Sequence, residues 1–287
     1  MTAPAALDTK RLREARPHLF AVAYRMLGSA ADAEDAVQEA LLRLAALPAP
    51  EEVRSVDAFL TTVVTRVCLD RLKSAQRRRE RYVGPWLPEP VCTEGDSDPG
   101  DPRAISFAFL VLLEALSPLE RAAFLLHDVF DYAYPDVAEV LSREVAAVRQ
   151  LVRRARGHLR DGRPRFAPSR EAHERVLHAF VGAVATGDLE GLTALLAEDV
   201  VSHSDGGGKV KSALKVLRGA DRVARFLIGT QQRFGANRTP RFVDLNGWPG
   251  LVLEEDGRPV GALSVETDGE RVLAVHVQLN PDKLAYV

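Results

Sequence analysis

The sequence predicts a multidomain protein with two all-helical domains followed by an α+β domain. Apolar residues recur at helical spacing over residues 8–82, where they predict a small helical bundle. A stretch rich in Pro, Gly, Ser and acid over residues 84–102 then interrupts the helices, which resume at about residue 104. After about residue 168, helices give way to alternating segments separated by Asp-Gly turns. A chain of 287 residues can build two or three such cores.

The first bundle is expected to contain helices around residues 19–27, 33–47 and 59–72. In the second helical domain, Ser117 is a natural N-cap, because Pro118 follows at the first helical position. Residues 134–156 predict a helix, a short turn and a second helix that carries several arginines. An arginine-rich second helix after a tight turn is typical of helix-turn-helix proteins that enter the major groove. The polar residues expected to face outward are Arg149, Gln150, Arg153, Arg154 and Arg156.

The last part of the chain is expected to begin with helices over 171–186 and 189–197. An irregular Gly-rich turn follows, and then a helix over about 220–234. Strands are predicted in four segments, two of whose connections, Asp256-Gly257 and Asp268-Gly269, favour hairpins. These segments are 240–245, 250–255, 258–266 and 271–278. The pattern indicates an α+β domain.

Composition argues against several classes of protein. No apolar run approaches the roughly 20 residues that span a bilayer, and the N-terminus lacks a signal peptide's pattern, so we expect a cytoplasmic protein without a membrane partner. Cys68 and Cys92 have neither CxxC spacing nor a disulfide pattern. His173 and His178 do not share a helix face, so we expect no metal site and no cofactor. The net charge is −2, but basic residues cluster at 71–81 and 149–165, the pattern to which phosphate backbones respond.

One helix face around residues 32–44 is acidic and polar, with Asp32, Asp35, Gln38 and Glu39 opposite an apolar stripe. Pattern alone leaves two interpretations, a solvated face or a docking surface for a basic partner. Residues 32–39 resemble the segment with which bacterial sigma factors of the extracytoplasmic-function group bind RNA polymerase. The resemblance implies that core RNA polymerase and promoter DNA are the partners.

Two further segments support this resemblance. Residues 116–121 and 134–156 are similar to the sigma-factor domain that reads the minus-35 promoter element. Residues 59–73 resemble the segment that engages the minus-10 element, although Phe59 replaces a frequent Trp and Arg66 a frequent Asn. The implied minus-35 contacts are Arg143, Arg149, Gln150, Arg153, Arg154 and Arg156. The implied minus-10 contacts are Arg66, Lys73, Arg77 and Arg78.

Three short motifs resemble those of a subgroup of these sigma factors, which implies a C-terminal SnoaL-like domain of the cone-shaped NTF2-like fold. The motifs are Trp86-Leu87-Pro88-Glu89-Pro90 in the linker, Asp205-Gly206-Gly207-Gly208-Lys209, and Asn280-Pro281-Asp282-Lys283-Leu284. In that subgroup the extra domain is thought to regulate the sigma factor, which implies contact between the linker and the two C-terminal motifs. The resulting domains are 1–83 (region 2-like), 84–103 (linker), 104–162 (region 4-like) and 168–287 (SnoaL-like).

Two other functions remain open. Titratable residues of the last domain can serve as acids or bases in an isomerase or cyclase; they are His203, Asp205, His276 and Asp282. The glycine run does not follow the pattern of a phosphate-binding loop. A helix-turn-helix regulator that senses a small-molecule ligand through its last domain is the other alternative. Fold alone does not decide among them, and we expect a non-enzymatic sigma factor with no catalytic residues.

Overall fold

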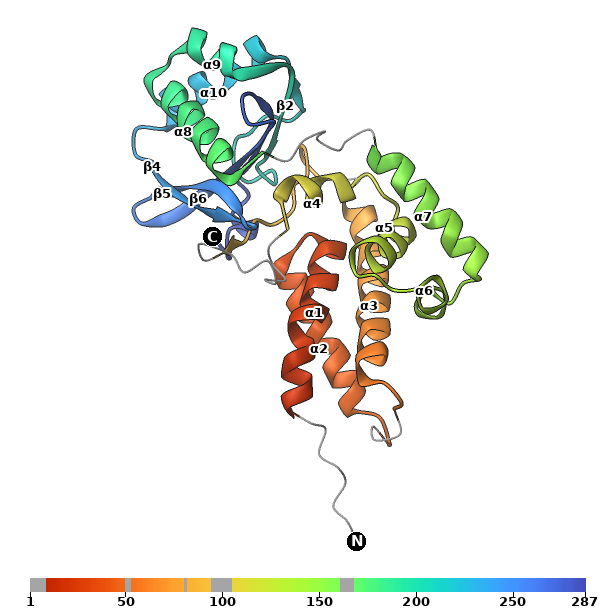
Figure 1. Cartoon of the computed structure of the whole chain (residues 1–287). Coiled ribbons are helices and arrows are strands. Elements are labelled where there is room, and N and C mark those ends of the chain that lie inside the picture. The colour runs from red at the N-terminus through yellow and green to blue at the C-terminus, as the bar shows by residue number, and fades with distance from the viewer. Residues whose placement is uncertain (1–8, 50–52, 80–81, 94–104, 161–167) are drawn as a thin grey trace. The chain divides into compact units, whose positions relative to one another are not determined.

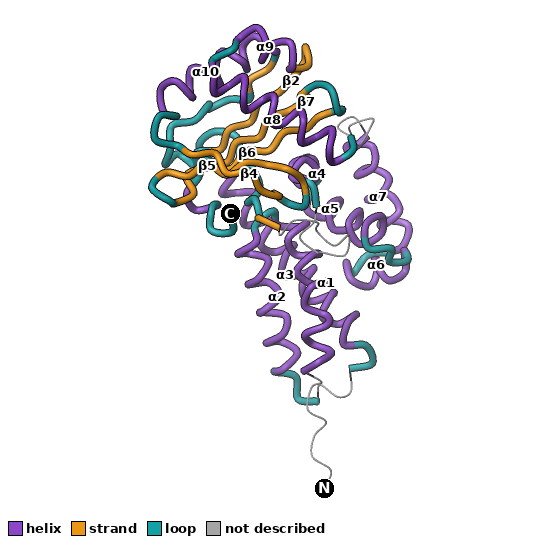
Figure 2. Tube along the Cα trace, turned by 60° about the vertical axis from the view of Figure 1, so that its left-hand side comes forward, coloured by secondary structure: helices purple, strands orange, loops and turns teal. Residues whose placement is uncertain are grey.

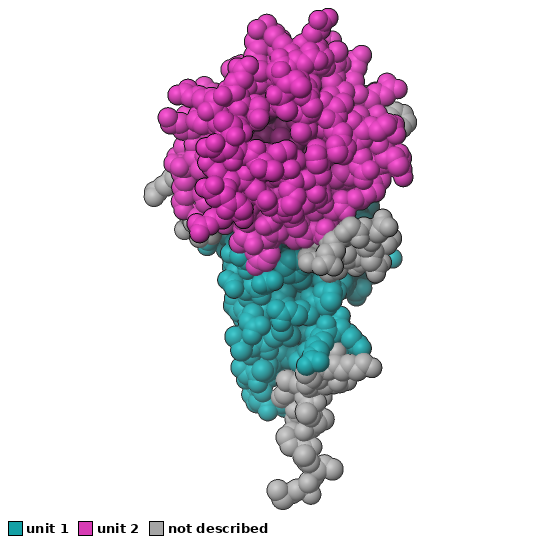
Figure 3. Space-filling model, turned by 90° about the vertical axis from the view of Figure 1, so that its left-hand side faces the viewer, with its two compact units in different colours: residues 1–80, 100–103, 109–163 teal, residues 81–99, 104–108, 164–287 magenta. Residues whose placement is uncertain are grey.

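The computed structural model describes residues 9–49, 53–79, 82–93, 105–160 and 168–287 (Figure 1). The chain forms two compact units, coloured separately in Figure 3. The first contains residues 1–80, 100–103 and 109–163, and the second contains residues 81–99, 104–108 and 164–287. The linker residues that the structure describes therefore group with the C-terminal domain. None of the described helices is long and apolar enough to cross a membrane.

Three helices open the first unit, as the apolar spacing predicts. They are α1 (Thr9–Leu27), α2 (Ala30–Ala45) and α3 (Val56–Arg79). Ser29 caps α2 by accepting a hydrogen bond from the backbone N–H of Asp32. Tyr24, Leu44 and Leu60, one from each helix, are fully buried. The interior of the bundle is thus formed by the apolar faces that the sequence indicated.

The second helical part contains α4 (Phe107–Leu113), α5 (Pro118–Phe124), a π-helical turn over Leu125–Val129, α6 (Tyr134–Leu141) and α7 (Val145–Arg160). The predicted start of α5 is confirmed, since Ser117 and Glu120 form a capping box and Pro118 lies in the first turn. Between α6 and α7 the chain turns through Ser142, which has a left-handed backbone with φ of 51°. The helix-turn-helix arrangement predicted for 134–156 is confirmed.

The second unit is a curved sheet with helices on one face (Figure 2). Its helices are α8 (Arg170–Thr186), α9 (Leu189–Leu195) and α10 (Ala220–Phe234). Its strands are β1 (Cys92–Thr93), β2 (Leu196–Asp205), β3 (Leu217–Arg218), β4 (Thr239–Leu245), β5 (Trp248–Glu255), β6 (Arg258–Thr267) and β7 (Val272–Gln278). The strand order is β1-β4-β5-β6-β7-β2-β3, in which β2 and β7 are parallel and the other pairs are antiparallel. The predicted fold class is confirmed.

The two faces of this sheet have different characters. Val275 and Val277 of β7 belong to the main core with Phe180 of α8 and Leu227 of α10. Because side chains alternate along a strand, His276 and Gln278 point to the opposite face. That second face is covered in part by linker residues, since β1 pairs with β4 and Leu87 and Val91 are buried. The linker therefore completes the domain.

Two expectations about secondary structure were wrong. The helix expected over 189–197 ends at Leu195, and the ten-residue strand β2, which was not predicted, lies between it and the Gly-rich turn. Its polar residues obscured the strand, because Glu198 and Asp199 are exposed while Val200 is buried. The linker was expected only to interrupt the helices, yet it contributes strand β1, and its Glu89 is 3% exposed. In each case pairing with distant strands supplies the partners that local sequence does not show.

Candidate functional sites

The acidic face of α2 is present and is partly neutralised from within the first unit. Asp35 and Gln38 are exposed on it. Arg71 of α3 donates a hydrogen bond to the backbone carbonyl of Asp32 at 2.9 Å, and its guanidinium lies 3.5–3.8 Å from the carboxylates of Asp32, Asp35 and Glu39. These carboxylates keep 39–74% of their side-chain surface exposed. Arg43 also pairs with Glu39, so two arginines face three carboxylates and the face stays acidic and accessible.

The predicted minus-10 residues lie on α3, and the structure describes the side chains of two of them. Arg66 donates hydrogen bonds to the carbonyl of Val140 at 3.3 Å and to the hydroxyl of Ser142 at 2.9 Å. Lys73 is exposed and paired with Asp70 at 3.0 Å. Arg77 and Arg78 lie on the C-terminal part of α3, but their side chains are outside the described residues. Arg66 is thus engaged by the end of α6 instead of being free.

The outer face of α7 and the turn before it, which contains Arg143, carry the predicted minus-35 residues. Arg143, Gln150 and Arg153 are exposed, as is Arg149, whose guanidinium lies 5.4 Å from the centre of the Tyr134 ring. Val148 and Val152 on the opposite side of α7 are buried, as the predicted packing requires. The second helix therefore presents a basic, accessible surface of the kind that fits a major groove.

Two other arginines of α7 are used inside this domain. Arg154 pairs with Glu120 at 2.9 Å, and Arg156 makes two hydrogen bonds with Asp128 at 2.7 Å. Burial alone would raise the pKa of Glu120, but hydrogen bonds from Ser117 and Arg154 lower it overall. Both arginines are more than half exposed, so they hold α7 in place while part of each guanidinium stays accessible.

The C-terminal motifs meet the linker around one buried carboxylate. Asp205, at the end of β2, has no exposed side-chain surface. Its Oδ1 accepts hydrogen bonds from the Tyr82 hydroxyl at 2.7 Å and the Gly207 N–H at 3.0 Å. Its Oδ2 accepts them from the Leu87 N–H at 2.9 Å and the Lys283 ammonium at 2.7 Å. We call this group of contacts the linker clamp.

Further groups of the clamp hold the linker backbone and aromatic rings. Lys283 also donates to the carbonyl of Leu87 at 2.7 Å, and its ammonium lies 4.1 Å from the centre of the Trp86 ring. Gln278 donates to the carbonyl of Pro88 at 3.1 Å. A cation over an aromatic face in a partly buried site is favourable. Lys283 therefore binds both the Asp205 carboxylate and the Trp86 ring of the linker.

The glycine run fits this site because side chains would clash there. A Cβ on Gly207 would lie 2.4 Å from the amide nitrogen of Asn280, and its φ of 60° favours glycine. At Gly206 a Cβ would lie 2.2 Å from the carbonyl oxygen of Val210. Gly208, with φ of 72°, approaches Val83 of the linker. The glycines therefore permit the close approach of three chain segments.

The third motif forms a capped turn next to the clamp. Asn280 caps the short 3-10 helix Pro281–Lys283 and donates a hydrogen bond from Nδ2 to the Tyr82 hydroxyl at 2.9 Å. Lys209 pairs with Asp282 at 2.6 Å, although both side chains are more than half exposed. Leu284 is buried in a small apolar cluster with Leu245.

The titratable residues considered for catalysis do not assemble into one centre. Asp205 is saturated by donors of the clamp, whereas Asp282 is exposed and paired with Lys209. His203 and His276 stack with ring centres 5.2 Å apart, and His276 lies 2.7 Å from Glu266. Within the described parts of the chain, no group of three or more His, Cys, Asp or Glu residues is arranged to hold a metal ion.

Comparison with known proteins agrees with this geometry. The family model of Sigma-70 region 2 matches residues 12–78, and that of Sigma-70, region 4, matches residues 106–159. The ECF RNA polymerase sigma factor SigJ of Mycobacterium tuberculosis is 43% identical over 238 residues, which cover 80% of this chain and 75% of SigJ. The chain belongs to the ECF RNA polymerase sigma factors. It is therefore a member of a family that binds core RNA polymerase and directs promoter recognition.

Two more comparisons extend over nearly the whole sigma factor. A probable ECF RNA polymerase sigma factor of the same organism, SigI, is 30% identical over 285 residues, 95% of this chain and 93% of its own length. The crystal structure of M. tuberculosis SigJ matches with a TM-score of 0.77 and 38% identity, covering 98% of this sigma factor and 100% of that chain. The helical regions and the C-terminal domain thus have a solved counterpart.

Sequence reasoning missed two side chains of the clamp. Tyr82 lies at the start of the linker, and nothing in the local pattern distinguishes it from an ordinary surface aromatic residue. Gln278 ends a strongly apolar strand and is 1% exposed. A buried amide in such a strand requires a hydrogen-bond partner. The amide of Gln278 would therefore have indicated a contact, but only after the strand had been assigned.

Proposed function

We propose that this sigma factor regulates its own promoter activity through the linker clamp. The observation that carries the proposal is the buried carboxylate of Asp205, which binds Tyr82, the Leu87 N–H and Lys283 at once. The linker joins region 2 to region 4, so fixing its backbone restricts the positions available to the two promoter-binding regions. The clamp thereby sets how readily the protein adopts the polymerase-bound arrangement.

For the partners themselves, we infer the surfaces from exposure and charge. Asp35, Gln38 and Glu39 on α2 are suited to a basic surface of core RNA polymerase. Arg149 and Arg153 on α7 are suited to the upstream promoter element, where arginine recognises guanine edges and phosphates. We therefore assign polymerase binding to these residues of α2 and upstream promoter binding to these residues of α7.

Contacts inside the first unit support a resting state. Arg66 is bound to Val140 and Ser142 of the helix-turn-helix, and Tyr132 hydrogen-bonds both His18 and Thr61 at 3.2 Å. A side chain engaged in this way must leave its partners before it touches DNA. We infer that promoter binding separates region 2 from region 4.

The test is transcription in vitro with purified core RNA polymerase on the DNA upstream of the gene. Lys283→Met removes the charge that joins Asp205 to the linker, and Tyr82→Phe removes one hydroxyl. We expect each to change transcript yield by about fivefold or more, the scale of a typical coupling between sites. Lys215→Met is the matched control, because Lys215 is exposed on the same domain. Yields equal to wild type for both clamp variants would refute regulation by the clamp.

A DNA-binding assay and an enzyme assay distinguish the two alternative functions. Sequence-specific DNA binding without initiation by core polymerase would favour a ligand-sensing helix-turn-helix regulator. Turnover by residues 168–287 alone would favour an isomerase or cyclase. We further propose that the C-terminal domain can hold a small molecule, since it contains two cavities of about 120 and 150 Å³.

A further inference from the structure

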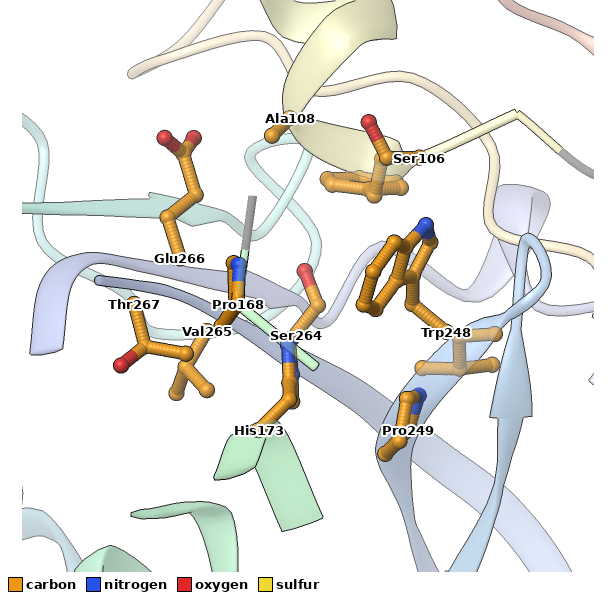
Figure 4. Close-up of a pocket in the computed structure, with 12 residues that line it drawn as sticks. Ser106, Ala108, Pro168, His173, Trp248, Pro249, Ser264, Val265, Glu266 and Thr267 are labelled. Carbon is orange, nitrogen blue, oxygen red and sulfur yellow. The ribbon is translucent and has the colours of Figure 1, made fainter. Parts of the chain in front are cut away.

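The larger of the two cavities, about 150 Å³, lies at the edge of the second sheet face and is open to one side (Figure 4). Apolar groups form most of its wall, including the rings of Phe107, Trp248, Pro168 and Pro249. Figure 4 shows the Trp248 indole and the Glu266 carboxylate on either side of the space, with Ser106 and Ala108 above it. Its volume is comparable to a cavity that holds one small ring.

The wall carries one formal charge and it is negative. Glu266 lines the cavity, and none of the lining residues is a lysine or an arginine. Its partner is the imidazole of His276, whose Nε2 lies 2.7 Å from Oε1. Among the described residues, no lysine or arginine forms an ion pair with Glu266. A carboxylate that is 19% exposed and has only an imidazole partner creates a negative potential in the cavity.

Two further histidines near this carboxylate, His203 and His173, add no positive charge at neutral pH, because burial lowers the pKa of each. Burial, with a smaller effect of His276, lowers the pKa of His203 to about 4. Burial also lowers the pKa of His173, although a hydrogen bond with the Pro249 backbone opposes the shift. His173 lines the cavity, is 6% exposed, and its Nε2 has no partner among the described residues. A neutral imidazole nitrogen of this kind can accept a hydrogen bond.

Aromatic faces, one carboxylate and an unpartnered imidazole nitrogen together recognise a cation with an apolar body. Aromatic rings attract ammonium groups through their negative faces, and desolvation strengthens the attraction. We propose that this cavity binds a compact organic ammonium ion, with its charge at Glu266 and its carbon atoms against Trp248 and Phe107. A neutral molecule of the same shape would leave the carboxylate poorly solvated, and an anion would be repelled.

Binding here also involves the start of region 4, directly after the linker, a consequence that rests on the proposed function. Residues 106–108 form part of the cavity wall and continue directly into region 4. Phe107 is 5% exposed, and its ring centre lies 5.7 Å from that of His276. A ligand that contacts Phe107 adds to the interactions holding this segment on the sheet. The ammonium ion would therefore favour the state in which the start of region 4 is held on the sheet.

The test uses the full chain and three probes of similar size: choline, its neutral isostere 3,3-dimethylbutan-1-ol, and 3,3-dimethylbutanoate. Titration calorimetry should show choline binding about tenfold more tightly than the alcohol, with no binding of the carboxylate. Hydrogen exchange followed by mass spectrometry should show slower exchange of the peptide containing residues 105–108 when choline is present. Equal affinities for choline and the alcohol, or no binding of choline, would overturn the proposal.

Variants confirm where the probe binds. Glu266→Gln should weaken choline about tenfold and leave the alcohol unchanged, and Trp248→Leu should weaken both. Glu270→Gln is the matched control, since Glu270 is exposed on the same hairpin and does not line the cavity. Unchanged choline affinity in Glu266→Gln would contradict the site. Choline binding that leaves transcription unchanged would refute the regulatory role while the binding site stands.

Discussion

Two segments, residues 82–91 in the linker and residues 105–108 at the start of region 4, lie on the same face of one sheet but are held by different interactions. Residues 82–91 are held by hydrogen bonds and charges that converge on Asp205. Residues 105–108 are held by apolar burial, with Phe107 packed beside His276. The neighbouring side chains His276 and Gln278 are two residues apart on β7, so one strand serves both attachments.

The difference has a consequence for regulation. Polar contacts of the clamp depend on direction, so they fix the register of the linker backbone through the Leu87 N–H and carbonyl. Apolar contact at Phe107 is less directional and fixes position more than register. We infer that the first attachment determines which conformation the linker adopts, and the second determines how firmly it stays.

The largest expected loss in the free energy of unfolding follows from removing Asp205, the centre of the polar contacts that hold residues 82–91. Asp205→Ala would leave the partly buried Lys283 ammonium and the donors of Tyr82, Leu87 and Gly207 without this acceptor. Removing one partner of a buried ion pair costs about 3–5 kcal/mol. Urea denaturation of the C-terminal domain, followed by the fluorescence of Trp86 and Trp248, would measure it. Asp221→Ala removes an exposed carboxylate of α10 and is the control. A loss below that of the control would contradict the central role of Asp205.

A somewhat smaller loss in the free energy of unfolding is expected from removing Phe107, which holds residues 105–108 by apolar contact. Phe107→Ala should destabilise the domain by about 3 kcal/mol, because it removes a buried aromatic ring. Hydrogen exchange at residues 82–91 should stay nearly unchanged, since the clamp remains intact. Faster exchange at both segments to the same degree would show that the two attachments open together.

The third prediction concerns pH. His203 has a pKa of about 4 in the folded protein against an ordinary value of 6.5, chiefly because of burial. Between these values the unfolded chain binds the extra proton, so stability is fully present above about pH 6.5 and declines as pH falls toward 4. The slope from one such group is at most about 1.4 kcal/mol per pH unit. Stability curves of wild type and His203→Gln should converge at low pH, and parallel curves would exclude His203 as the cause.

The smallest effect is expected at the rim of the clamp. Lys209 and Asp282 are paired at 2.6 Å but remain more than half exposed. Lys209→Ala should therefore cost less than about 1 kcal/mol, as exposed ion pairs do. The loss should shrink further in high salt. A loss comparable to that of Asp205→Ala would mean that the rim, not the buried carboxylate, holds the motif.

Local sequence determined the helices and many of the turns of this sigma factor. Apolar spacing predicted α1 to α3 and α10, and Ser117 with Pro118 predicted the start of α5. The arginines of the second helix of the helix-turn-helix were also predicted to face outward. These features depend on residues within a few turns of one another, so the sequence pattern contains the information.

Tertiary structure alone decided what the polar residues do. Arg154 and Arg156 resemble Arg149 in sequence, yet acidic partners about 30 residues away engage them. Strand β2 and the burial of the linker depend on pairing with β7 and β4, which lie far along the chain. Asp205 gains its donors from residues 82–87 and 283. Burial and long-range partners set the energy of each polar group, and these are properties of the folded chain.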